Sequence, residues 1–460
     1  MSDAPRQITL DEWDERYAQL RAAGLSEPSY GGPLRRHLAG GDMRLARLRY
    51  DNSPAALRLW NFLLTEEERL RAAQDGGAKI VGAMKDLGTV PVMAYSLDNV
   101  AAFYPDGAWW IPCMMELSAG LLDIADSLGF DESFCPVRAM LGAFVTGEHF
   151  PRPDLLTCSV GAMCDDLSAI AQRIEAMGER IVWWEAPHRR RPDPGETPVT
   201  LPGGFLAPQS QVDFVRGQLQ IVADALANLI GQQLDAQMLA AGIAEANRVR
   251  AVLRELRTLA YTSDPCPLGA LEMLIAEMLA IHFCSDRAES VGVLEGLLAE
   301  VRRRVDAGVG IADRDAAKIF WINPVADLRV MNLLEECGGR ICGTEYLFSH
   351  AIDEIPTDIE PMEALAQMAL ADPMVGSASD RVEAICRQIS ESGSQAAVIS
   401  RISGASHCAM EGAVIADRIR SRLGLPVLEI EIPPLSDSMR ATLNTRIEAL
   451  SRSYNNKEDN

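Results

Sequence analysis

The sequence has 460 residues, of which 48% are hydrophobic and 23% are charged, as in an ordinary globular protein. This length allows two or three domains, because single hydrophobic cores rarely grow much beyond about 250 residues. The formal net charge of -22 argues against nucleic acids and anionic membrane surfaces as partners, since both attract lysine and arginine.

The N-terminal region, residues 1–75, has the pattern of charged helices. Its start lacks a positively charged segment followed by an apolar core, and nowhere does the chain approach about 18 uninterrupted apolar residues. We therefore expect a soluble, cytoplasmic protein without a membrane partner. Thr65, followed by Glu68 three residues later, has the pattern of a capping box at the start of a helix.

Two short buried strands are predicted next, from "KIVGAM" (79–84) and "VPVMAYSL" (90–97). A helical segment at 114–130 then leads to Cys135, which directly precedes Pro136. Proline is favoured in the first turn of a helix, so Cys135 should lie at a helix N-terminus.

A strand, a loop, a helix and a further strand are predicted over residues 153–188. "PDLLTCSV" is the first strand, "CDDLSAIAQRIEAMG" the helix and "ERIVWWEAPH" the second strand. This order predicts a parallel sheet, and open α/β sheets bind their ligands at the carboxyl edge of the strands. Cys158 ends the first strand and Cys164 precedes the helix, so both thiols are expected near that edge.

The remaining chain predicts a helical insertion, residues 206–310, followed by a second α/β series, residues 311–460. Strands are expected from "AKIFWINP", "RICGTEYL", "QAAVISRI" and "LPVLEIEIPP", with helices between them and Cys408 between a strand and a helix. We therefore predict an α/β fold of two Rossmann-like parallel-sheet lobes with a cleft between them. The first lobe is expected to span residues 76–205 and to follow the helical N-terminal region, 1–75.

Three cysteines share one predicted position, directly before a helix: Cys135, Cys164 and Cys408. All three could face the cleft, and helix N-termini favour thiolates because their N–H groups and dipole lower a thiol pKa. Three thiolates with one open position suit a [4Fe–4S] cluster better than zinc, whose closed sites need four ligands. The alternative is structural, because the three are widely separated in sequence and cysteine is often a core residue.

The other cysteines lack this position. The role of Cys158 stays open, because it could serve as a ligand or simply pack in the core. Ten cysteines are too few for a disulfide scaffold in a chain of this length. We therefore expect the remaining six to be free thiols in the core. These expected core thiols are Cys113, Cys266, Cys284, Cys337, Cys342 and Cys386.

Three polar residues are candidates for chemistry near the cysteines. His407, adjacent to the third cysteine, could donate a proton or hydrogen-bond a cluster sulfur, or only cap the turn. Arg138, one turn after the first cysteine, could bind an anionic ligand or pair with Asp131 or Glu132. Glu345 follows a predicted strand and could act as an acid or base, or simply lie at the sheet edge.

Several common chemistries lack their motifs. No GxGxxG follows a strand, and no GxxxxGK[ST], HExxH or GxSxG is present. This argues against a dinucleotide enzyme, an ATPase, a zinc protease of the HExxH class and an α/β-hydrolase.

Four stretches, in this order, carry a resemblance to a known family: "CPVRAMLGAFVTG", "PDLLTCSVGAMCDD", "KIFWINPVADLRVMNLLEECGGRICGTE" and "HCAMEGAVIADRIRSRLGLPVLEIEIPPLSDSMRATLNTRIEAL". They resemble the 2-hydroxyacyl-CoA dehydratase D-component family, which also contains the cluster-bearing subunits of benzoyl-CoA reductases. The likeness covers roughly residues 79 to 455. It selects Cys164 over Cys158, because the family's strand ends in a Cys-Asp pair.

The resemblance implies one [4Fe–4S] cluster held by Cys135, Cys164 and Cys408, a homologous second subunit, and a separate ATP-hydrolysing Fe–S activator. The activator delivers single low-potential electrons, so ATP acts only through it. In the dehydratases the electron forms a ketyl radical anion of the acyl-CoA that expels the hydroxyl group. In the reductases electrons enter the ring of an aryl-CoA.

Two readings without catalysis remain open beside this one. The chain could be a non-catalytic Fe–S electron relay or scaffold for a substrate-binding partner. It could also be a two-lobed binding protein whose thiols are structural.

Overall fold

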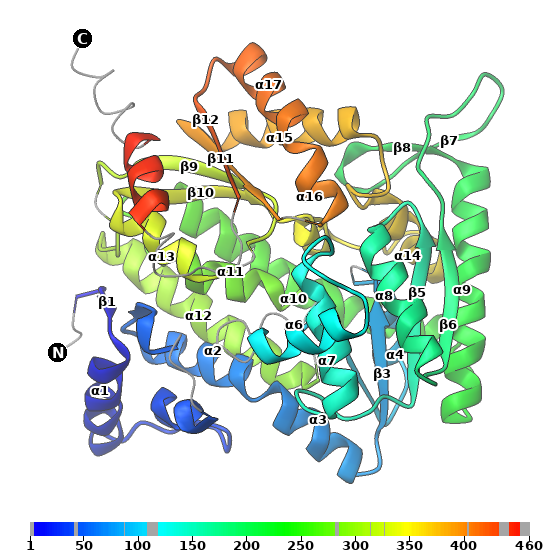
Figure 1. Cartoon of the computed structure of the whole chain (residues 1–460), viewed down its shortest axis with the longest axis horizontal. Helices are drawn as coiled ribbons and strands as arrows, with labels where there is room; N and C mark the ends of the chain where they lie inside the picture. The colour runs from blue at the N-terminus through cyan, green and yellow to red at the C-terminus, as the bar shows by residue number, and fades with distance from the viewer. Residues whose placement is uncertain are drawn as a thin grey trace.

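Two four-stranded parallel sheets, each flanked by helices, organise the chain (Figure 1). The computed structural model describes residues 4–40, 45–86, 88–107, 118–280, 285–312, 314–325, 327–402, 404–431 and 441–450. The sheets form two Rossmann-like lobes, which confirms the predicted α/β fold class. Within the described ranges, no helix combines the length and the apolar character needed to cross a membrane.

The first sheet has the order β4-β3-β5-β6, with every neighbouring pair parallel. Its strands are β3 (Lys79–Met84), β4 (Val100–Phe103), β5 (Leu155–Gly161) and β6 (Ile181–Ala186). Its helices are α4 (Val90–Tyr95), α6 (Ser118–Ser127), η3 (Pro136–Arg138), α7 (Ala139–Thr146) and α8 (Asp165–Ala176). Alternate strand residues pack on opposite faces: Ile80 packs with α7 and α8, and Val81 packs with the core on the α4 side.

The second sheet has the order β10-β9-β11-β12 and is also parallel throughout. Its strands are β9 (Ala317–Ile322), β10 (Gly339–Glu345), β11 (Ala396–Arg401) and β12 (Val427–Glu431). Its helices are α13 (Arg329–Glu336), η5 (Phe348–Ile352), α14 (Pro361–Ala371), α15 (Ala378–Ser392), α16 (Ser406–Met410) and α17 (Gly412–Leu423). Residues 441–450 are helical.

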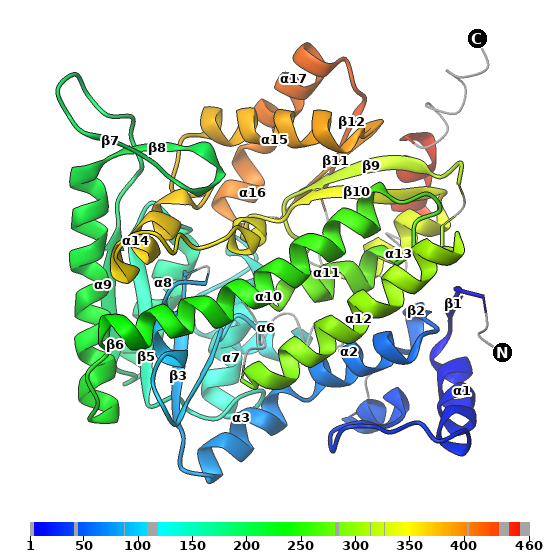
Figure 2. The same ribbon diagram turned by 180° about the vertical axis from the view of Figure 1, so that it is seen from behind.

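Four helices of the described residues lie between the first lobe and the second lobe in the chain. They are α9 (Gln209–Ile230), α10 (Ala236–Thr262), α11 (Ala270–Met278) and α12 (Arg287–Ala307), and they follow the hairpin of β7 (Pro198–Thr200), η4 (Pro202–Gly204) and β8 (Leu206–Pro208). Helix α10 contacts α4 of the first lobe and β10 of the second (Figure 2). It therefore joins the lobes whose facing edges hold the candidate residues.

The N-terminal region packs against these helices. It contains β1 (Gln7–Ile8), α1 (Leu10–Ala22), η1 (Leu34–Gly40), η2 (Leu45–Arg47), β2 (Tyr50–Asp51), α2 (Pro54–Leu64) and α3 (Glu66–Asp75). Asp51 is fully buried and accepts two hydrogen bonds from Arg304 of α12, at 2.5 and 2.9 Å. This buried ion pair fixes the region to the rest of the chain.

Two local predictions are wrong. The predicted strand at 90–97 is the helix α4, with Pro91 in its first turn. Every residue of α4 is buried, so its apolar run lacks the periodicity that separates a helix from a strand. Thr65 does precede α3, but its hydroxyl donates to the carbonyl of Asn61 at 2.6 Å and caps nothing.

Candidate functional site

Two of the three candidate cysteines lie at helix starts, as predicted. Cys135 immediately precedes η3 and Cys164 immediately precedes α8, and both are half-buried. The backbone N–H of Val137 acts to lower the pKa of Cys135, and those of Asp166 and Leu167 act to lower the pKa of Cys164. Neither sulfur accepts a capping hydrogen bond from its helix.

Cys408 differs from the prediction in its local position. It is buried inside the short helix α16 rather than before a helix, because helical structure begins at Ser406, two residues before it, and α17 follows from Gly412. It still lies between β11 and α17, at the carboxyl edge of the second sheet.

Direct contacts bring the three cysteine segments together. The backbone N–H of Cys135 donates to the carboxylate of Asp166, in the first turn after Cys164, at 3.0 Å. Gly404, between β11 and α16, packs on the backbone of Phe134 and Cys135. A Cβ at Gly404 would lie 2.3 Å from the carbonyl carbon of Phe134 and 2.5 Å from the nitrogen of Cys135. The loop before Cys408 thus lies directly against the loop that carries Cys135.

Replacing Gly404 with alanine is expected to lower the free energy of unfolding by about 1–3 kcal/mol. Gly404 has a φ of +81°, which strains an L-residue, and the added methyl group would meet backbone. Urea unfolding measures the loss. Gly424→Ala is the matched control, because Gly424 has a φ of +65° but nothing within 4 Å of its Cβ position. Equal losses in the two variants would contradict a close approach at Gly404.

Burial controls the protonation of the metal-free thiols. It raises the pKa of Cys135 well above its usual value, and the charges of Cys164 and Cys408 raise it further. It raises the pKa of Cys408 to about 12 against the opposing charge of Arg381. It also raises the pKa of Cys164, although the N–H groups of α8 oppose this. Burial therefore opposes the thiolate form, which the helix N-termini favour.

The same interactions show that the three thiols lie within electrostatic range of one another. Among the described residues, no group of three or more His, Cys, Asp or Glu side chains is arranged to hold a single metal ion. Ligands of a four-iron cluster bind separate irons, so their sulfur atoms lie farther apart than the ligands of one ion. Three neighbouring cysteines are the soft donor set that such clusters use.

Cys158 occupies a different environment. It is fully buried in β5 and packs in the core under α7 and α8, and its sulfur donates to the carbonyl of Ser159 at 3.4 Å. Burial raises its pKa to about 12. Of the other expected core thiols, Cys266, Cys342 and Cys386 are buried, Cys337 is half-buried, and Cys113 and Cys284 lie outside the described residues.

His407 and a carboxyl group that the sequence pattern did not reveal lie together beside Cys408. The Nε2 atom of His407 is 3.2 Å from the carbonyl of Met374, and burial lowers the pKa of its imidazole. Asp372, at the end of α14, is fully buried. One of its oxygens accepts from the N–H of Met374 at 2.7 Å, and the other has no hydrogen-bond partner among the described residues. Burial raises the pKa of Asp372 to about 7, and the charge of His407 lowers it.

Glu345 lies at the end of β10 in a buried ionic network. It accepts two hydrogen bonds from Arg381 of α15, at 3.1 and 2.7 Å. Arg381 also donates to Glu411 at 2.6 Å and to the side chain of Asn323 at 2.5 Å. Arg381 therefore holds two carboxylates beside Cys408, and sequence reasoning found only one of the three residues.

Arg138 supports the Cys135 loop. It is buried, its Nη1 donates to the carbonyl of Phe134 at 3.0 Å, and its Nε lies 3.5 Å from a carboxylate oxygen of Asp126. The carboxylate within ion-pair distance is thus Asp126, which the sequence did not indicate, while the charge of Arg138 also acts on the expected partner Asp131. The reason is that α6, which carries Asp126, packs against η3.

A family model described as 2-hydroxyglutaryl-CoA dehydratase, D-component, matches residues 94–453, which include all three candidate cysteines. A comparison with curated proteins finds no significant match.

Proposed function

Because the chain belongs to the family of 2-hydroxyglutaryl-CoA dehydratase D-components, we propose that it is the [4Fe–4S] subunit of a radical acyl-CoA enzyme. Membership makes it a dehydratase-type enzyme subunit. A 2-hydroxyacyl-CoA dehydratase is the first choice, and an ATP-dependent aryl-CoA reductase is the second. The observation that carries the proposal is the convergence of the three cysteine segments, which Asp166 and Gly404 hold against the Cys135 loop.

The proposed ligands are Cys135, Cys164 and Cys408. Thiolates are the ligands of [4Fe–4S] clusters, and three of them leave one iron without a protein ligand. When bound, such a cluster supplies one-electron transfer and an open iron for an oxygen or sulfur atom. The donor set fits this group, because all three proposed ligands are cysteines. Two of them come from the first lobe and one from the second.

A buried cation supports a negatively charged group at this position. The ammonium of Lys85 is buried, donates to Ser168 at 2.8 Å, and its charge acts on Cys164. Nearby charges and hydrogen bonds tune the potentials of iron–sulfur centres, so Lys85 is positioned to favour the reduced form. The charge of Arg381 also acts on Cys408, but the carboxylates of Glu345 and Glu411 act on it in the opposite direction.

The proposed proton-handling residues are His407 and Asp372, with Glu345 held by Arg381 behind them. A hydroxyl group leaves more easily as water, which requires a proton at the oxygen. Asp372 has a buried oxygen without a described partner, and His407 holds a proton on Nε2 against the carbonyl of Met374. Arg138 positions the Cys135 loop through the carbonyl of Phe134.

The proposed partners are a homologous second subunit, an ATP-hydrolysing Fe–S activator and an acyl-CoA or aryl-CoA substrate, in the cytoplasm. The alternative function is a non-catalytic electron relay or scaffold. We keep this alternative because the described residues bring the proposed ligands together but do not identify which substrate binds near the cysteines.

Anaerobic purification of the complete complex tests the proposal. We expect a brown protein with about four irons and four sulfides per copy of this chain. Adding a 2-hydroxyacyl-CoA or benzoyl-CoA to the reduced protein should perturb the EPR signal of the cluster, and which compound does so separates dehydratase from reductase. An unperturbed signal favours the relay. An iron-free complex would exclude both functions.

A further inference from the structure

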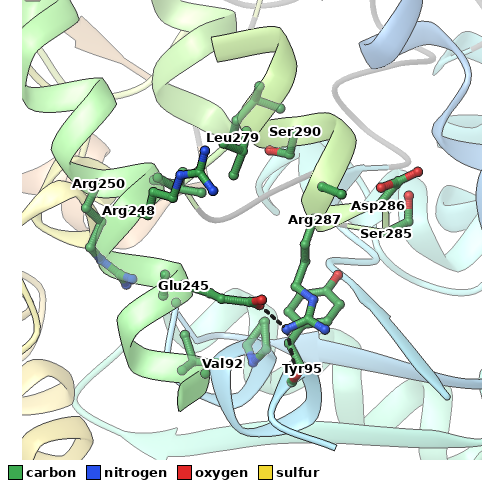
Figure 3. A pocket seen from close by; sticks show the side chains of 18 of the residues that line it. Val92, Tyr95, Glu245, Arg248, Arg250, Leu279, Ser285, Asp286, Arg287 and Ser290 are labelled. Carbon is green, nitrogen blue, oxygen red and sulfur yellow. Dashed lines mark hydrogen bonds and ion pairs between the residues drawn. The ribbon is translucent and has the colours of Figure 1, made fainter. Parts of the chain in front are cut away.

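A cavity of about 600 Å³ lies between α4, α10 and α12, apart from the three cysteines (Figure 3). Ligand sites commonly have volumes of about 300–1,000 Å³. The cavity lies between the first lobe and the helical insertion, for which the sequence indicated no site. Neither the proposed cluster nor the proton-handling residues use it.

The inner wall of this cavity is apolar. Val92 of α4 and Leu279, just after α11, are buried and line it, and Val249 of α10 and Val291 of α12 line it while half-buried. Binding an aliphatic chain against such a wall lowers the free energy, in proportion to the apolar area removed from water.

Two buried polar side chains interrupt the apolar wall, Arg250 of α10 and Ser290 of α12. Ser290, in the first turns of α12, is 2% exposed, and its hydroxyl oxygen has no hydrogen-bond partner among the residues described. Asp286 already caps α12 by accepting from the N–H of Glu289, so this hydroxyl is not needed to start the helix. Figure 3 shows the hydroxyl directed toward the space between α10 and α12. A ligand oxygen there would satisfy a buried group that is otherwise costly.

Two exposed ion pairs between α10 and α12 cross the mouth of the cavity, and a ligand can displace them. Arg248 of α10 pairs with Glu295 of α12 at 2.7 Å, and Glu245 of α10 pairs with Arg287 of α12. The side chains of both pairs are 41–63% exposed, and exposed pairs contribute little to stability. The cavity is therefore accessible from solvent between α10 and α12.

We propose that this cavity binds a short aliphatic acyl compound whose carbonyl oxygen accepts a hydrogen bond from Ser290. A free carboxylic acid, its amide and its CoA thioester share this chemistry. The inference does not depend on an iron–sulfur cluster. Gly88 and Pro91 line the cavity, and Lys85, at the start of the same loop after β3, acts on Cys164. A ligand here thus lies one loop away from the proposed cluster.

A matched pair of tryptophan variants tests the site. Ala246 of α10 lines the cavity, whereas Ala244 of the same helix is exposed and outside the lining. Calorimetry would use hexanoate, hexanamide and hexanoyl-CoA, none of which carries a 2-hydroxyl group. We expect Ala246→Trp to weaken binding of at least one probe by about tenfold or more, and Ala244→Trp to leave it unchanged. The bound probe identifies the source of the acyl group.

Ser290→Ala supplies a second variant that disturbs packing less. We expect it to weaken binding by about fivefold, the effect of one hydrogen bond. Repeating the titration with iron-free Cys164→Ala protein separates this site from the cysteines, and binding should persist there. The inference is overturned if no probe binds the wild-type complex at millimolar concentration, or if Ala246→Trp and Ser290→Ala bind every probe as the wild type does.

Discussion

Replacing Cys164 with alanine should remove most of the iron from the anaerobically purified protein, and Cys135→Ala and Cys408→Ala should do the same. Each change leaves two of the three proposed thiolate ligands, and a [4Fe–4S] cluster with two protein ligands is poorly held. The loss is expected even if the chain folds normally, since Cys135 and Cys164 are only half-buried. Iron and sulfide content, together with the visible absorption of the brown complex, measures it.

Cys158→Ala is the matched control for this series. Cys158 lies in the strand before Cys164 and is fully buried in the core of the first lobe. Its replacement removes one buried sulfur, so we expect a stability loss of about 1 kcal/mol and unchanged iron content. Full iron in Cys164→Ala, or equal iron loss in Cys158→Ala and Cys164→Ala, would contradict the assignment of Cys164 as a ligand.

The sequence predicts the elements of both sheets well where strand, loop and helix alternate. β3 covers "KIVGAM" and β5 ends just before the Cys164 loop, because β-branched and apolar runs bounded by turns are local signals. The helix α4 is mispredicted because its burial on all sides removes the local pattern. The strand beside β3 is instead β4, Val100–Phe103, a run too short to stand out.

The candidate site is only partly predictable for a different reason. Helix starts placed Cys135 and Cys164 correctly, since a cysteine before proline or after a strand is visible in sequence. The contact of Gly404 with the Cys135 loop joins residues that are far apart in the chain. Asp372 and Arg381 likewise gain their roles from burial between elements. Tertiary packing of this kind leaves no local pattern in one sequence.

Arg381→Met is the substitution expected to cost most stability, lowering the free energy of unfolding by about 3–5 kcal/mol. The guanidinium is 1% exposed and pairs with Glu345 and Glu411, whose side chains are 7% and 19% exposed. Methionine matches the aliphatic part of arginine but leaves both carboxylates buried without their cation. Breaking a buried ion pair from one side is costly because the remaining charge is desolvated and uncompensated.

Urea unfolding of the protein, followed by fluorescence, measures the loss of stability in Arg381→Met and compares it with the loss in Arg387→Met. Arg387 lies on the same helix, is exposed, and makes one hydrogen bond to the carbonyl of Gly203 at 3.1 Å, so its replacement should cost less than about 1 kcal/mol. Adding Glu345→Gln and Glu411→Gln to Arg381→Met should recover part of the stability, because the stranded charges disappear. If the two methionine variants unfold alike, the network is not the buried anchor that its geometry indicates. If the glutamine changes recover nothing, the loss comes from packing rather than charge, and Arg381 holds the Cys408 edge by its shape alone.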